Sequence, residues 1–146
     1  MRNKRLMITI VTDWIQYTVA VTGVGTITLT ESFYMRQGDS IFVRGRFALG
    51  ITAASGVSLS LPTGLVIDSK KELSTALYGL LVNQAAATQF SVLGAGDGTT
   101  LSVGSLAANP LSIVLGTTLG AAADTVSFIA GPIPIAGWKP FKSVVL

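Results

Sequence analysis

The sequence predicts an all-β protein, a single antiparallel β-sandwich of jelly-roll-like form. Apolar and polar residues alternate over many short runs, which is the pattern of half-buried strands. Gly, Asp, Asn and Ser gather between these runs, where turns are expected. The runs recur every 8–12 residues or so, roughly the spacing of sandwiches and barrels. Together these features predict about eight to ten short strands.

The clearest alternation lies in Ser32–Phe47, which predicts two strands joined by a tight turn. Gly38-Asp39 forms the turn, because Gly takes the positive φ that a two-residue hairpin needs and Asp can bond its own backbone. In the second strand the apolar face carries Ile41, Val43, Gly45 and Phe47, and the opposite face carries Arg44 and Arg46. A glycine at mid-strand indicates a bulge or another backbone lying close to it.

Further strands are predicted from the same alternation at residues 14–22, 26–30, 57–61, 88–93 and 125–129. The turn Asp97-Gly98 is a hairpin signal. The inward-facing residues expected from these patterns include Ile15, Tyr17, Val19, Val21, Ile27, Leu29, Leu101, Val103, Leu111, Ile113, Leu115 and Val126. Pro132 and Pro134 place the last segment on an edge or a surface, because proline cannot donate to a ladder.

A short helix competes with strand near residues 69–79. Ser69 followed by Glu72 fits a capping box, and Leu73, Leu77 and Leu81 would line one side at helical spacing. Gly79 and the apolar run behind it limit this helix to a turn or two before another strand.

The composition predicts an obligate oligomer. The chain has 146 residues, of which 49% are hydrophobic and 12% are charged. An ordinary soluble domain has about 25% charged residues. One domain of this size would leave apolar surface in water, and large exposed apolar patches usually mark interfaces.

The residue types exclude several kinds of chemistry. Cys and His are absent, which removes disulfides, thiol nucleophiles, the usual zinc ligands and His-based triads. Most of the seven acids stand beside turn residues, so we expect solvated turn acids and no enzyme, metal or cofactor site. The net charge of +3, without a dense basic face, predicts no nucleic-acid partner. Residues 98–123 are uncharged, but Gly, Asn-Pro, Ser and Thr divide them, so we expect no membrane span.

Six short motifs follow one another along the chain: Asp13–Tyr17, Thr22–Thr26, Phe33–Ser40, Val43–Phe47, Leu61–Leu65 and Pro134–Trp138. In this order they resemble a module of tailed-bacteriophage virion proteins, which often forms the C-terminal knob of tail-fibre and minor structural proteins. Residues 68–128 share with it only a richness in Gly and Thr. The resemblance implies a compact β-sandwich that forms homotrimers and sits on the outside of a particle.

The resemblance leads to two expectations about function. No coiled-coil, collagen-like or β-helical shaft precedes the module; we expect an N-terminal arm at residues 1–12 and a knob domain at 13–146. We therefore expect a capsid decoration (cement) protein whose trimeric knobs bind the major capsid protein on the outer surface of the capsid. The alternative is the receptor-binding tip of a tail fibre, which would bind host surface glycan through exposed loops and aromatic residues. Trp14, Tyr17, Tyr34 and Trp138 could form a platform for a sugar ring, but we favour for them the role of core and interface anchors.

Two sets of residues are candidates for these contacts. The arm is basic, extended and apolar and can add a strand to an exposed sheet edge of the shell; its candidate residues are Arg2, Lys4, Arg5, Leu6, Ile8 and Ile10. The candidate trimer or partner interface consists of Arg44, Arg46, Pro132, Pro134 and Trp138. The two arginines form either a solvated face or pairs with acids of a neighbouring subunit or the shell. The Pro-rich end is the candidate seam between protomers.

Overall fold

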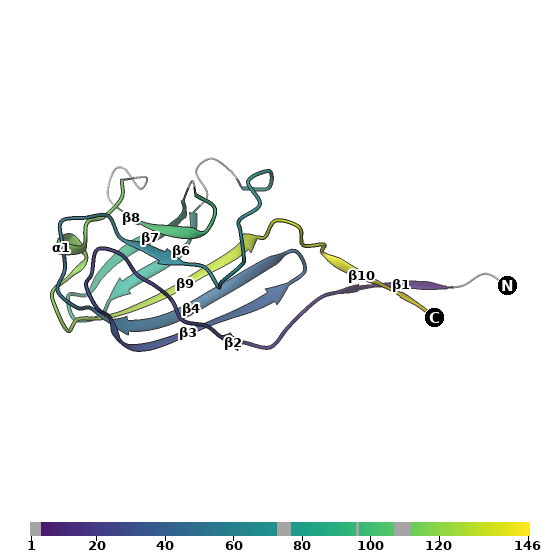
Figure 1. The fold of residues 1–146 in the computed structure, drawn as a ribbon, viewed down its shortest axis with the longest axis horizontal. Helices are drawn as coiled ribbons and strands as arrows, with labels where there is room; N and C mark the ends of the chain where they lie inside the picture. The colour runs from purple at the N-terminus through teal and green to yellow at the C-terminus, as the bar shows by residue number, and fades with distance from the viewer. Residues whose placement is uncertain (1–3, 73–76, 96, 107–111) are drawn as a thin grey trace.

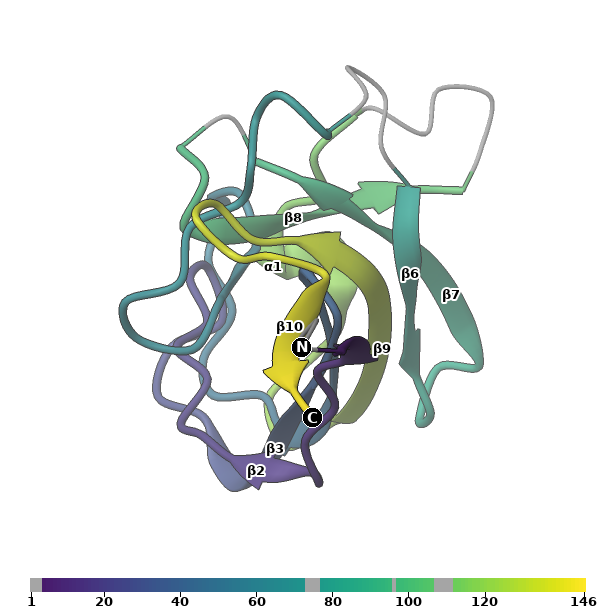
Figure 2. The same ribbon diagram turned by 90° about the vertical axis from the view of Figure 1, so that its right-hand side faces the viewer.

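The computed structural model describes residues 4–72, 77–95, 97–106 and 112–146, and in these residues the fold is all-β and sandwich-like, as predicted. Its elements are β1 (Arg5–Thr9), β2 (Ile15–Gln16), β3 (Thr28–Gln37), β4 (Ser40–Ala48), β5 (Ser58–Ser60), β6 (Leu77–Asn83), β7 (Thr88–Gly94), β8 (Thr100–Ser105), α1 (Gly116–Leu119), β9 (Thr125–Pro134) and β10 (Phe141–Val145). Eight strands form one curled antiparallel sheet in the order β2-β3-β4-β9-β6-β7-β8-β5 (Figure 2). The other two, β1 and β10, form a ribbon that projects from one end of this body (Figure 1).

One segment, residues 15–22, joins the two ends of the curled sheet: it begins as the edge strand β2 and then hydrogen-bonds the other edge strand, β5. Next to β2, the Tyr17 N–H donates to the Ser32 carbonyl of β3 at 3.0 Å. At the β5 edge, the Ser60 N–H donates to the Ala20 carbonyl at 2.9 Å and the Thr22 N–H to the Ser58 carbonyl at 3.1 Å. Because the segment pairs with β3 at its start and with β5 at its end, the sheet closes on itself there, and the β5 edge is protected against open-ended strand addition.

The core fills the inside of the curl. β4 and β9 are central, and their inward residues are Ile41, Val43, Phe47, Val126, Phe128, Ala130 and Ile133, all buried. The opposite wall supplies Val57, Leu59, Val92, Leu101 and Val103. Burying a large aliphatic or aromatic side chain stabilises a fold by roughly 1.5–3 kcal/mol, so this cluster is the main source of stability.

The hairpin predicted within Ser32–Phe47 is confirmed. β3 and β4 pair up to Gln37 opposite Ser40, and Gly38 has a φ of 65° in the turn between them. Gly45 meets the predicted close approach, because a Cβ there would lie 2.6 Å from the Glu31 carbonyl oxygen and 2.9 Å from Cε1 of Phe128. The pairing of β3 with β4 is irregular between Thr28 and Glu31, next to this contact.

Several predicted inward residues point outward instead. Leu29 is 73% exposed, because the irregularity in β3 shifts the alternation there. The exposed residues also include Ile15, Ile113 and Leu115. Near α1 the alternation is one residue out of step with the prediction, so that Val114 is buried in place of its neighbours. Leu111 lies outside the described residues.

The region of the predicted short helix begins as a single turn. The N–H groups of Lys71 and Glu72 both donate to the Asp68 carbonyl at 3.0 Å, and the Asp68 carboxylate accepts from the Lys70 N–H. Asp68, rather than Ser69, therefore caps this turn. Residues 73–76 lie outside the described part of the chain, and the strand predicted after the turn is β6.

Candidate functional site

The predicted arm is paired with the other end of the chain. β1 lies antiparallel to β10, in register from Arg5 opposite Val145 to Thr9 opposite Phe141. Of the candidate arm residues, Lys4, Arg5, Leu6 and Ile8 are exposed on this ribbon and Ile10 is half-buried at its root, whereas Arg2 lies outside the described residues. Sequence reasoning missed β10 as part of this site, although residues 141–145 carry an apolar pattern like that of the arm.

The ribbon is apolar and exposed on both faces. Leu6 and Ile8 lie on one face, where they are 47% and 45% exposed. Met7 and Phe141 lie on the other, where they are 60% and 47% exposed. A two-stranded ribbon is at best marginally stable alone in water, so this one has the properties of a surface that a partner covers.

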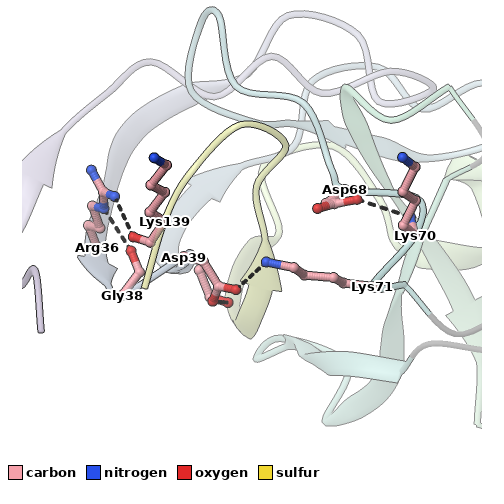
Figure 3. Close-up of polar contacts among 8 residues, drawn as sticks. Arg36, Gly38, Asp39, Asp68, Lys70, Lys71 and Lys139 are labelled. Carbon is pink, nitrogen blue, oxygen red and sulfur yellow. Dashed lines mark hydrogen bonds and ion pairs between the residues drawn. The ribbon is translucent and has the colours of Figure 1, made fainter. Parts of the chain in front are cut away.

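The root of the ribbon is held by the turn of the β3–β4 hairpin. Arg36 Nε donates to the Gly38 carbonyl at 2.7 Å, and its Nη2 donates to the Lys139 carbonyl at 3.1 Å (Figure 3). On the other side, the Gly38 N–H donates to the Ile10 carbonyl at 2.7 Å. The hairpin turn thus contacts both strands of the ribbon where they leave the body.

Trp138, the predicted seam residue, lies at this root. Its ring faces the Arg36 guanidinium, whose carbon is 4.1 Å from the ring centre, and its side chain packs partly against the core. A cation over an aromatic face adds roughly 0.5–1 kcal/mol at a partly exposed site. Trp138 therefore has a structural contact within its own chain.

A second polar contact supports the same region. Lys71 pairs with the Asp39 carboxylate in the hairpin turn (Figure 3). The hydrogen bond from Lys71 lowers the pKa of Asp39, and the same hydrogen bond raises the pKa of Lys71. The Asp68 N–H also donates to the Pro134 carbonyl at 2.8 Å. The turn at residues 68–71 is thereby joined to the β3–β4 turn and to the end of β9.

The two predicted edge prolines lie in a central strand. β9 sits between β4 and β6, but β6 pairs only with residues from Val126 to Ala130. Pro132 and Pro134 lie beyond that pairing, where β9 keeps β4 as its ladder neighbour, and Pro132 is exposed. The predicted edge or surface position is thus confirmed for the proline segment, which β6 does not cover, although β9 as a whole is a central strand.

Arg44 and Arg46 point outward from the curled sheet, on the side opposite the core, as the alternation predicted. Both have partners within the chain: the Arg44 guanidinium carbon lies 4.1 Å from the centre of the Trp14 ring, and Arg46 Nε donates to the Glu31 carboxylate at 2.8 Å. The Arg46–Glu31 pair is more than half exposed, so its net contribution to stability is small.

An apolar groove of about 540 Å³ lies beside these arginines. It runs over β3, β4, β9 and β6 and is lined by Glu31, Phe33, Arg44, Gly45, Arg46, Leu80, Val82, Ser127, Phe128 and Ile129. Ile129 is 57% exposed and Leu80 41% exposed. The sequence could have indicated this groove, because apolar residues stand at outward positions of strands 77–83 and 125–134. We call this surface the outer face.

The four aromatic residues named for a glycan platform do not form one. Tyr17 and Tyr34 pack edge to face with ring centres 5.9 Å apart, both partly buried against the core. Trp14 and Trp138 each face a different arginine, Arg44 and Arg36. The aromatic surface is therefore divided between the core, the outer face and the ribbon root.

Most of the acids lie in or beside turns, as predicted, whereas Glu31 lies in β3. The described residues contain no group of three or more acids that could hold a metal ion. Asp97 accepts from the N–H groups of Thr99 and Thr100 in the β7–β8 turn, and these hydrogen bonds lower its pKa. Asp124 accepts from Asn83 and from the Ala121 N–H, which lowers its pKa also. These contacts are those of turn-stabilising carboxylates.

No helix in the described part of the chain is both long and apolar enough to cross a membrane. Comparison of the chain with protein-family models, with curated proteins and with solved structures finds no match. The function is therefore inferred from the residues and their arrangement.

Proposed function

We propose that this chain is a structural protein of a tailed-bacteriophage virion, a capsid decoration (cement) protein. In this proposal, three copies form a knob that binds the major capsid protein on the outer surface of the capsid. The six motifs that resemble the virion module support the assignment. The absence of Cys and His favours a structural role over catalysis.

The observation that carries the proposal is the β1–β10 ribbon. It projects from a body whose sheet is closed by residues 15–22, and its large apolar side chains are exposed on both faces (Figure 1). These side chains are about half exposed, so covering each of them would stabilise a complex by roughly 1 kcal/mol before the costs of association. Such a ribbon suits attachment to a larger assembly, which we take to be the shell.

The outer face is our candidate for contacts between copies. It combines the apolar groove with two cations and one acid, Arg44, Arg46 and Glu31. A neighbouring copy can therefore bring its own Glu31 against the excess positive charge of this face while apolar side chains fill the groove. Of the candidate interface residues, Arg44 and Arg46 belong to this surface.

Stabilisation of the capsid follows from mass action. A protein that binds the assembled shell, but not its separated subunits, shifts the equilibrium toward assembly by an amount set by concentration and affinity. Repetition over a lattice multiplies a modest free energy at each site. No catalytic group is needed for this function.

The experiment that tests the proposal is the copy number per virion, measured by quantitative densitometry of purified particles against the major capsid protein. Hundreds of copies are expected for a lattice decoration. A few to a few dozen would overturn the capsid assignment in favour of a tail-fibre tip, and a sugar ligand would then be sought. Complete absence from particles would overturn the virion assignment.

A further inference from the structure

The positive charge of the chain is concentrated at the ribbon. Half of the ten Lys and Arg lie in residues 1–12 and 139–146, namely Arg2, Lys4, Arg5, Lys139 and Lys142, whereas all seven acids lie between these two segments. Lys4, Arg5 and Lys142 are exposed. Both ion pairs in the described residues, Arg46–Glu31 and Lys71–Asp39, belong to the body. The ribbon thus presents cationic side chains and has no acidic side chain of its own to neutralise them.

The ribbon also presents two strand edges. The Leu146 N–H donates to the Lys4 carbonyl at 2.7 Å, which makes these opposite residues a hydrogen-bonded pair. In an antiparallel ladder such pairs alternate, so Leu6 and Ile8 direct their N–H groups toward β10. The N–H groups of Arg5, Met7 and Thr9 then point away from β10, and those of Phe141, Ser143 and Val145 point away from β1. Within the described residues, β1 and β10 have no other strand partner.

The hairpin turn orients this ribbon before any partner binds. Gly38 bonds the Ile10 carbonyl on the β1 side, and Arg36 bonds the Lys139 carbonyl on the β10 side. A contact element held in one direction loses less conformational entropy on docking than a free arm does. Figure 1 shows the ribbon extending straight out from the body.

We infer that the ribbon docks by strand addition onto a sheet edge of the shell protein that is flanked by acidic side chains. The inference rests on the proposed function, because it takes the shell as the partner. Outward N–H and C=O groups supply main-chain hydrogen bonds, and Leu6, Met7 and Phe141 supply apolar contact. Lys4, Arg5 and Lys142 face the acids. A lipid interior would leave the main-chain N–H and C=O groups of the ribbon edges unpaired, which is costly. The phosphates of a nucleic acid would offer the apolar side chains no contact that stabilises them. A sheet edge of a protein therefore fits the ribbon best.

The test measures binding of the full chain to purified capsid shells by co-sedimentation. Met7→Pro removes an outward N–H from β1 and Ser143→Pro removes one from β10, each without breaking the bonds between the two strands. Only one of the two ribbon edges can pair with the edge of the shell protein, and only the variant on that edge loses a hydrogen bond to the shell. We therefore expect one of the two proline variants to weaken binding by roughly tenfold or more. Met7→Ala, which keeps the N–H, is the matched control for the lost side chain. Circular dichroism checks that the body remains folded.

The charge requirement is tested in the same assay. Arg5→Glu and Lys142→Glu should each weaken binding, and weakening should also follow a rise in salt, since the contact joins opposite charges. Lys70→Glu makes the same charge change on the body and should bind as the unaltered chain does. If the unaltered chain binds shells and both proline variants bind them as tightly as the unaltered chain does, strand addition is overturned and the proposed function stands. If the unaltered chain does not bind shells, both are overturned.

Discussion

At the scale of single residues, the most consequential polar side chain is Asn83. It is fully buried, its Nδ2 donates to the Leu119 carbonyl at 2.9 Å and to Asp124, and its Oδ1 accepts from the Ala85 and Ala86 N–H groups. One side chain therefore joins the β6–β7 turn to the end of α1. A buried amide is stable only where its donors and acceptors are paired, and here the fold pairs them.

The carboxylates in turns predict loss of stability in acid. The pKa values of Asp39, Asp97 and Asp124 are lowered in the folded chain by hydrogen bonds, chiefly from Lys71, the Thr99 N–H and Asn83 respectively. Groups whose folded pKa is lowered add stability above the unfolded pKa, about 4, and lose it as the pH falls through the folded pKa. Thermal unfolding followed by circular dichroism should show the midpoint falling below that pH. Asp124→Asn should make the decline shallower, and an unchanged decline would contradict this account.

At the scale of elements, the β3–β4 hairpin has two roles. Its strands form part of the central sheet, and its turn holds the root of the ribbon through Arg36 and Gly38. The motif at residues 33–40 therefore links the core to the exposed extension. Gly38 in the turn accordingly bonds Ile10, a residue far away in the sequence.

Removal of this support should loosen the ribbon without unfolding the body. In Arg36→Ala, the bonds to Gly38 and Lys139 and the contact with Trp138 are lost together. We expect faster amide hydrogen exchange in β1 and β10, while β4 and β9 keep their protection because the core is unchanged. Lys139→Ala is the matched control, because Arg36 bonds the carbonyl and not the side chain of Lys139. Equal exchange in the ribbon of both variants would show that Arg36 does not hold it.

At the scale of the whole molecule, covered and exposed surfaces are separated. Residues 15–22 join β3 to β5 and close the curled sheet, so the β5 edge resists strand addition. The ribbon and the outer face instead expose large apolar side chains. In a chain with 12% charged residues, these two apolar surfaces are each suited to a different partner.

The outer face predicts the effect of one charge on assembly. We expect the unaltered chain to be a trimer by multi-angle light scattering and Ile129→Glu to shift it to monomers, because a carboxylate in the covered groove would lose its hydration. Ile51→Glu is the matched control, since Ile51 is 84% exposed on a loop away from the groove residues. A trimer that survives Ile129→Glu at low concentration would place the contact between copies elsewhere. A monomeric unaltered chain would contradict the trimer.

The sequence by itself determined the fold class, the central hairpin, the turn acids and most of the core, because each depends on alternation or turn chemistry within a few neighbouring residues. The buried pattern of residues 57–61 and the φ of Gly38 are examples. Only the tertiary structure decided that the arm pairs with residues 141–145, that the segment with two prolines belongs to a central strand, and that Leu29 faces water. Strand partners far apart in the chain and irregularities of register are set by packing between elements, which local periodicity does not encode.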